Sequence, residues 1–176
     1  MFKVSFVIEG DPVPKGRPRF TVAENKAWMS NNTKANQKCT IEQLVADNTG
    51  KKQSSRGFVR AYTPKKTKEY ESLVALMSKA AMRGRAPVDV PVHITIKAFF
   101  EIPKSARKAE KQAAAEEKLW HMGRKDGDNI QKSIWDGMIG IVYKDDRQVC
   151  ESIFAKKYST HPRTEVFIWE LEGAAR

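Results

Sequence analysis

The sequence is poor in cysteine and histidine, with two and three residues respectively among 176. Cys39 and Cys150 stand alone, without the paired spacing of a zinc knuckle or a redox motif. So few cysteines in a chain of this length are typical of a reducing compartment, and we expect two unpaired thiols. The scattered histidines form no Ser-His-Asp or Cys-His arrangement, which argues against those forms of nucleophilic catalysis.

Long apolar runs and targeting segments are also missing. No apolar run approaches the length of a bilayer-spanning helix, and the first residues show no signal peptide. The stretch 10–16 contains two glycines but lacks the Gly-Lys-Ser/Thr ending of a phosphate-binding loop. We therefore expect a cytoplasmic protein that does not associate with membranes.

Positive charge is abundant: 32 lysines and arginines oppose 21 acidic residues, giving a formal net charge of +11 and a pI near 9.7. Such a field attracts polyanions, and the local grouping of the charges favours nucleic acid. A membrane surface fits less well, because no basic helix carries a large apolar face. The groups expected to contact DNA phosphates are Lys15, Arg17 and Arg19 on one face of an extended segment, and Lys65, Lys66 and Lys68 at a helix start. The alternative for each group is an ordinary solvated edge or helix end.

Hydrophobic periodicity predicts an α/β (α+β) fold, a mixed β-sheet packed against helices. One domain spans residues 1–176, with a long polar loop at about 23–60. The expected strands are Phe2–Glu9, Val90–Phe100, one beginning at Ile141, and Arg147–Tyr158 paired antiparallel with Thr164–Leu171. The expected helices run from Thr63-Pro64 to Gly84, from Ser105 to Trp120, and from Asp128 as N-cap to about Met138.

Clustered carboxylates at the start of that last helix are the main candidate site. Asp126 and Asp128 repel each other unless a proton or a cation neutralises them, and Mg²⁺ prefers oxygen ligands of this kind. Asp128, Lys132 and Asp136 share one helical face, at intervals of four residues. A lysine beside a metal suits phosphoryl chemistry, because it stabilises charge on the oxygens of the transition state.

A third carboxylate would come from Asp145 or Asp146. Neighbouring residues of an extended strand point to opposite faces, so one of the two is expected to face the site. The alternative is structural: Asp126 and Asp128 form a turn and a helix cap, Lys132 makes a surface salt bridge, and the later pair forms a hairpin turn. Spacing alone leaves both interpretations open.

The stretch 126–137, followed by 142–149, resembles the signature of the RusA-type Holliday junction resolvases: D-x-D-N-x-x-K, a short helix, and then D-D-x-Q-V. Segments 15–20 and 61–67 also resemble upstream parts of that family. The resemblance implies a homodimer that nicks four-way DNA junctions symmetrically with Mg²⁺, or Mn²⁺ as an alternative. It assigns essential roles to Asp126, Asp128, Lys132 and Asp146, and metal binding to the three aspartates. Supporting roles fall to Asn129, Asp136 and Asp145.

Two departures from the family pattern concern substrate preference more than chemistry. Lys125 precedes the first aspartate where many relatives have proline, and the polar loop at about 23–60 is longer than expected. Two other functions stay open. The first is a non-catalytic protein that binds branched or single-stranded DNA, and the second is a nuclease for other branched DNA such as flaps.

Overall fold

The computed structural model describes residues 2–23 and 58–172 of the chain. The chain forms two compact units, one of residues 1–16 and 65–176 and the other of residues 17–64. Cys39 and most of the predicted polar loop lie outside the described residues. That all 176 residues form one domain stays a prediction.

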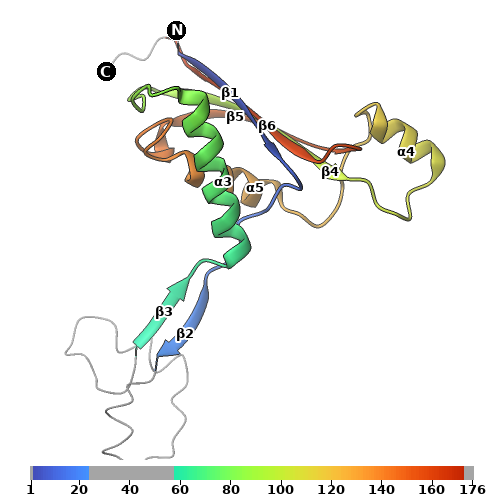
Figure 1. Ribbon diagram of the computed structural model, residues 1–176, viewed down its shortest axis with the longest axis horizontal. Helices are drawn as coiled ribbons and strands as arrows, with labels where there is room; N and C mark the ends of the chain where they lie inside the picture. The colour runs from blue at the N-terminus through green and yellow to red at the C-terminus, as the bar shows by residue number, and fades with distance from the viewer. Residues whose placement is uncertain (1, 24–57, 173–176) are drawn as a thin grey trace, which may run out of the picture. The chain divides into compact units, whose positions relative to one another are not determined.

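A four-stranded mixed sheet forms the framework of the larger unit (Figure 1). Strand order is β1-β6-β4-β5, with β4 parallel to β5 and antiparallel to β6, and β1 antiparallel to β6. The predicted mixed sheet packed against helices is therefore confirmed. The strands are β1 Lys3–Glu9, β4 Val92–Glu101, β5 Val149–Ser159 and β6 Arg163–Glu170.

The predicted hairpin between β5 and β6 is wrong, because β4 lies between them. Ser159 at the end of β5 is opposite Glu101, and Arg163 at the start of β6 is opposite Phe99. The short connection therefore crosses the end of β4. β4 is buried along most of its length. Its apolar sequence therefore suits a position between two neighbouring strands.

Two helices cover one face of this sheet and enclose the core. α3 runs over Lys65–Met82 and α5 over Gly127–Met138, in good agreement with the predicted helices. Alternate residues of the strands face them, as the period of two in a strand requires. The largest fully buried side chains include Ile8, Val74, Ile94, Ile96, Phe100, Ile130, Ile134, Met138, Tyr143 and Ile168.

The third helix, α4 (Lys108–Ala115), lies at one end of the sheet and is shorter than predicted (Figure 1). Glu117 has a left-handed backbone with φ of 54°, which a helix cannot contain. Trp120, expected in the helix, instead pairs with Lys157 of β5 and is exposed. The sequence after Ala115 is rich in good helix formers, so the sheet contact overrides local propensity here.

The smaller unit contains a two-stranded antiparallel sheet, of β2 (Arg19–Ala23) and β3 (Phe58–Tyr62). The polar loop predicted up to about residue 60 is therefore wrong for its last residues, which belong to β3. Of the extended segment expected over residues 15–20, only Arg19 and Phe20 belong to a strand, since β2 begins at Arg19.

Close contact between α3 and α5 depends on Gly137. A Cβ atom at this position would lie 2.7 Å from Cβ of Val74 and 2.8 Å from the backbone oxygen of Glu71. Only glycine permits this approach, because the second contact is with backbone that cannot move aside. The same approach brings the Glu71 turn of α3 next to Asp136 of α5.

Candidate active site

Helix α5 presents a buried stripe to the core and a charged stripe to the opposite side. Asp128, Lys132 and Asp136 follow one another at i, i+4 and i+8 and share the charged stripe, as predicted. Each is only partly buried or exposed. The buried stripe consists of Ile130, Ser133, Ile134, Gly137 and Met138.

The helix begins two residues earlier than expected. Asp126, not Asp128, is the N-cap residue, with an extended backbone (φ −69°, ψ 134°) and no side-chain capping bond. Asp128 lies in the first turn, so its prediction as N-cap is wrong. Both carboxylates are exposed, and the Asn129 side chain donates to Oδ2 of Asp126 at 3.4 Å. A helix N-terminus favours negative charge, which suits the presence of two carboxylates there.

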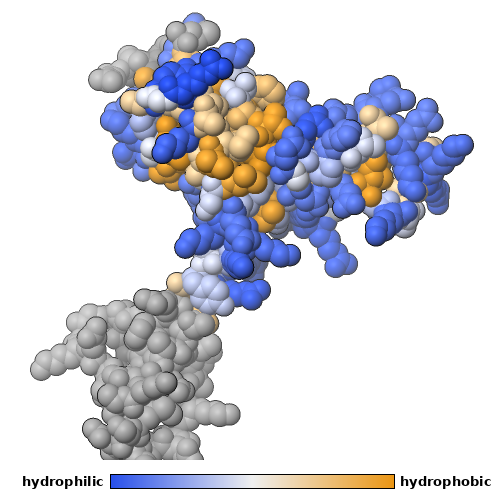
Figure 2. Space-filling model, viewed as in Figure 1, coloured by the Kyte–Doolittle hydropathy of each residue, from blue (hydrophilic) through white to orange (hydrophobic). Residues whose placement is uncertain are grey.

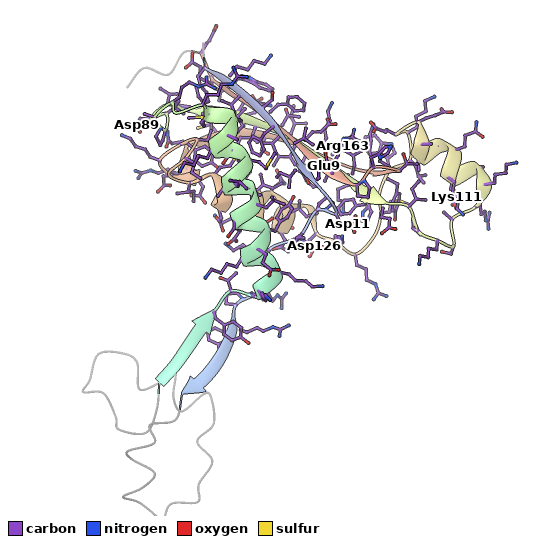
Figure 3. The ribbon with its side chains drawn as sticks, viewed as in Figure 1. Glu9, Asp11, Asp89, Lys111, Asp126 and Arg163 are labelled. Atoms are coloured by element: carbon purple, nitrogen blue, oxygen red, sulfur yellow. The ribbon has the colours of Figure 1, made fainter. Side chains whose placement is uncertain are left out.

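Contacts with β5 fix the position of this end of α5. A Cβ at Gly127 would lie 2.8 Å from the ring of Phe154, so the helix start lies directly on β5. One turn further, Ser152 Oγ donates to Oε1 of Gln131 at 2.7 Å. Figure 3 shows Asp126 near the loop that carries Asp11, and Lys125 pairs with Asp11 at 3.3 Å. The start of α5 therefore lies between this loop and the middle of β5.

The later pair of aspartates lies in a tight turn before β5. The strand predicted from Ile141 is absent: Asp146–Gln148 form a short 3₁₀ helix, η1, and Asp145 caps it. The carboxylate of Asp145 accepts from the backbone N–H of Arg147 at 3.0 Å, whereas Asp146 accepts a hydrogen bond from Lys132. Of this pair only Asp146 faces α5, and one of the two was expected to do so. A helical turn, and not the alternation of a strand, makes their side chains point in different directions.

Gln148 holds this turn in place. Its side-chain oxygen accepts from the backbone N–H groups of Lys144 at 2.8 Å and Asp145 at 3.1 Å. Its amide nitrogen donates to the carbonyls of Val88 at 3.0 Å and Val90 at 3.1 Å. Four bonds from one side chain tie the Asp145-Asp146 turn to the segment that leads into β4. The sequence motif D-D-x-Q thus contains both the carboxylate and the residue that fixes its position.

Lys132 connects Asp146 to a further set of charges. Its ammonium group contacts Asp146 and also lies 3.2 Å from Oδ1 of Asp136. Lys15 forms an ion pair with the other oxygen of Asp136 and lies 3.6 Å from Glu71 of α3. These contacts form a row of side chains with alternating charge: Asp146, Lys132, Asp136, Lys15 and Glu71. Glu71 was not predicted, and no signal in the sequence marks it, since it enters only through the contact between α3 and α5.

Two pKa values reflect this arrangement. The hydrogen bond from Lys132 lowers the pKa of Asp146 below its ordinary value. Tyr143, which is fully buried, donates to the carbonyl of Trp135 at 2.9 Å. Burial, with a smaller effect of the Asp146 charge, raises the pKa of Tyr143. Asp146 is therefore ionised at neutral pH and Tyr143 is not.

Within residues 2–23 and 58–172, no group of three or more acidic, histidine or cysteine side chains is arranged to hold a metal ion. The donor chemistry still fits a hard divalent cation, which takes carboxylate oxygens. Asp146 already binds a cation, the ammonium group of Lys132. Asp128 lies one helical turn from Lys132, and Asp126 lies at the mouth of the same helix.

The predicted DNA-contacting residues fall into different settings. Lys65, Lys66 and Lys68 are exposed at the start of α3, where the first turn contains no acidic residue, and hydrophilic side chains gather around this end of the helix (Figure 2). Lys65 lies 3.6 Å from Glu69. Lys15 belongs to the larger unit and turns towards Asp136, while Arg17 and Arg19 belong to the smaller unit. That Lys15, Arg17 and Arg19 share one face stays a prediction.

Comparison with known proteins bears on this arrangement. The sequence model of the family "Endodeoxyribonuclease RusA" matches residues 43–169. The chain belongs to the RusA endodeoxyribonuclease family. The match includes all of α5 and η1, so the carboxylates and Lys132 lie in the part that defines this nuclease family. Lys15 lies outside the matched residues.

A relative in Bacillus subtilis (strain 168) resembles this RusA-family chain over nearly its whole length. It is described as "Uncharacterized protein YqaN", and it is 28% identical over 172 residues, covering 97% of this chain and 98% of the relative. Among the residues that the structure describes, none of the helices is both long and apolar enough to span a bilayer.

Proposed function

We propose that this RusA-family nuclease resolves four-way DNA junctions by paired phosphodiester hydrolysis that depends on Mg²⁺, with Mn²⁺ as a substitute. The observation that carries the proposal is the Lys132–Asp146 contact, which joins the two halves of the family motif across fourteen residues of sequence. Asp126 and Asp128 lie at the start of the helix that carries Lys132. A capping role accounts poorly for the Asp126 side chain, since it makes no capping bond.

In this proposal Asp126, Asp128 and Asp146 hold the divalent cation. A cation held there would polarise the scissile phosphate and help a water molecule to lose its proton. Lys132 donates hydrogen bonds to the phosphate oxygens on which negative charge builds up in the transition state. The water oxygen bonds to phosphorus and gives up a proton to solvent, the bond from phosphorus to one sugar oxygen breaks, and that oxygen takes up a proton from solvent. Asn129, Asp136 and Asp145 support these groups through their side-chain contacts.

Basic side chains would hold the DNA without reading its sequence. Lys65, Lys66 and Lys68 are exposed at a helix N-terminus, a setting that favours phosphate. Arg17 and Arg19 are proposed to add contacts from the smaller unit. The net charge of +11 supports attraction of the duplex arms. A protein of this kind acts on DNA inside the cell, so a cytoplasmic location belongs to the same proposal.

A homodimer is part of the proposal, because two equivalent strands of a junction need two related active sites. Figure 2 shows apolar side chains at the surface of the larger unit, and Leu73 and Leu76 of α3 are exposed. An apolar area on a basic protein is a candidate for contact with another protein surface. Sedimentation velocity of the purified protein would show the oligomeric state directly.

An Asp128→Asn variant tests the chemistry separately from binding. Gel-shift assays in EDTA should show junction binding within about twofold of the wild type, while cleavage with Mg²⁺ falls by at least roughly a hundredfold. Asp89→Asn is the matched control, since Asp89 is an aspartate paired with Lys144 at 2.7 Å outside the site. A wild type that binds junctions and leaves them uncut with either metal would favour the binding-protein alternative. Equal cutting of flaps and junctions would favour a general branched-DNA nuclease.

A further inference from the structure

Lys132 is shared by two carboxylates that differ in how firmly they are held. Its ammonium group contacts Asp146 and lies 3.2 Å from Oδ1 of Asp136. Side-chain exposure is 32% for Asp146 and 18% for Asp136, so Asp136 is the more enclosed partner. The lysine is itself 44% exposed and reaches the site from the solvent side.

Asp136 is fixed by Lys15, which occupies its second oxygen. The segment that carries Lys15 is bound to α5 by its backbone: the N–H of Lys15 donates to the carbonyl of Asn129 at 2.8 Å, and Ser133 donates to the carbonyl of Val13 at 2.8 Å. On the other side, the buried Oε1 of Glu71 accepts no hydrogen bond from the described residues and has Lys15 at 3.6 Å. Lys15 thus lies between two carboxylates that both need its charge.

The ammonium group on Asp146 and a divalent cation on the same oxygen exclude each other. Two positive charges at hydrogen-bonding distance repel strongly, and a carboxylate oxygen that accepts from an ammonium group has no lone pair left in that direction. Asp136 keeps its contact with Lys132, because Lys15 holds the Asp136 carboxylate in place from the other side. When Asp146 takes up a metal ion, Lys132 therefore keeps one anchor and loses the other.

We propose that Asp136, held by Lys15, is a positioning residue that keeps Lys132 at the site in both states. In the metal-free protein Lys132 is the counter-cation of Asp146, and in the metal-bound protein it stays on Asp136 with its remaining hydrogens directed at the scissile phosphate. The inference rests on the proposed metal-dependent function, but it concerns the residues of this chain and predicts metal binding without DNA or catalysis.

Loss of the Lys132 side chain should change metal affinity in the direction opposite to loss of a metal ligand. Removing Lys132 removes a competitor, so Lys132→Met should bind the metal more tightly while it loses activity. Removing the negative charge of Asp136 should weaken metal binding, because Lys132 then has Asp146 as its main partner and competes harder for it. This second effect requires Lys132 to be present.

Titration of Mn²⁺ followed by electron paramagnetic resonance tests this, since only free Mn²⁺ gives the sharp signal. The full chain without DNA is compared as wild type, Lys132→Met and Lys144→Met. Lys144 is the control of equal charge, because its ammonium pairs with Asp89 and not with the site. We expect Lys132→Met to bind Mn²⁺ roughly two- to fivefold more tightly, the range expected for a partly exposed ion pair, and Lys144→Met to change less than twofold.

A double-mutant cycle identifies the role of Asp136. We expect Asp136→Asn to weaken Mn²⁺ binding about two- to threefold in the wild type and to have no effect in Lys132→Met. An equal weakening in both backgrounds would make Asp136 a ligand or a distant charge and overturn the positioning role. Unchanged binding in Lys132→Met, with metal-dependent cutting by the wild type intact, would overturn the inference and leave the proposed function standing. A wild type that neither binds Mn²⁺ nor cuts DNA would overturn the proposed function itself.

Discussion

Lys132 of α5 donates a hydrogen bond to the carboxylate of Asp146 in the turn before β5. The two residues belong to different elements, and each is fixed independently: the helix by its buried stripe and by Gly127 on Phe154, the turn by Gln148. The contact therefore follows from the packing of the whole α5–β5 layer. It places a cation beside an anion, the pair that the proposed phosphoryl chemistry would use.

Replacing the charge of Lys132 should reduce the rate of cleavage more than DNA binding. For Lys132→Met we expect kcat for junction cleavage to fall by roughly 10²–10³-fold, the usual effect of losing one donor to a transition-state oxygen. Lys132→Arg should restore only part of the rate, since a planar guanidinium does not replace a compact ammonium group. Single-turnover cleavage with Mg²⁺ measures both. A variant that cuts at the wild-type rate would remove Lys132 from the chemistry.

Lys15 should act through Asp136 and not by contacting DNA. In Lys15→Met we expect kcat to fall by roughly tenfold, as for other outer partners of catalytic groups, with KM within about twofold of the wild type. Lys15→Arg should recover most of the loss, since it keeps a charge between Asp136 and Glu71. Steady-state kinetics on a four-way junction separates the two parameters. A raised KM with unchanged kcat would instead identify Lys15 as a phosphate contact.

The lysines at the start of α3 should determine part of the salt dependence of binding. Each phosphate contact contributes about 0.9 to the slope of log affinity against log salt. Changing Lys65, Lys66 and Lys68 together to alanine should lower the magnitude of the slope by roughly 2–3, because all three are exposed. The matched triple change of Lys104, Lys108 and Lys111 removes equal charge near α4 and should alter the slope by less than about 1. Equal slopes for both triple variants would contradict the assignment.

Tyr70 should make the fold sensitive to strong alkali. Its hydroxyl is buried against Thr164 at 2.9 Å, and burial raises its pKa from 10.0 to about 12. The unfolded chain therefore loses this proton first, so the contribution to stability is complete below pH 10 and is lost as the pH rises towards 12. We expect the free energy of unfolding to fall by roughly 2–3 kcal/mol over this window through Tyr70.

Urea unfolding at intervals between pH 9 and pH 12, in parallel with Tyr70→Phe, measures this contribution. The variant has no hydroxyl to titrate and should decline less steeply. Part of the decline should persist in the variant, because burial raises the pKa of Tyr143 as well. Identical pH dependence in both proteins would contradict the buried state of Tyr70.

The elements with strong local patterns could be predicted from the sequence, and their pairing could not. The stripe of Ile130, Ile134 and Met138 predicted α5, and the alternation in residues 90–100 predicted β4. The short connection between β5 and β6 indicated a hairpin, yet β4 lies between them. Strand order depends on which apolar strand buries most of its surface between two neighbours. This is a comparison across the whole chain, which a local pattern does not contain.

The site divides in the same way. Helical periodicity predicts that Asp128, Lys132 and Asp136 share a face, and the family motif predicts Asp146. The places of Lys15 and Glu71 in the row of charges depend on contacts made in the folded chain, above all the approach of α3 and α5 at Gly137. Lys15 was predicted as a DNA contact because charge patterns show which residues are basic but not which acidic residues they meet.

The most direct test of the central claim uses a synthetic four-way junction with one strand end-labelled at a time. With wild-type protein and Mg²⁺, the account predicts nicks at matching positions on two opposing strands, and their absence with Asp126→Asn or Asp128→Asn. Cutting of a linear duplex of the same sequence should be far slower. An intact junction with Mg²⁺ and with Mn²⁺, or equal cutting by the aspartate variants, would contradict it.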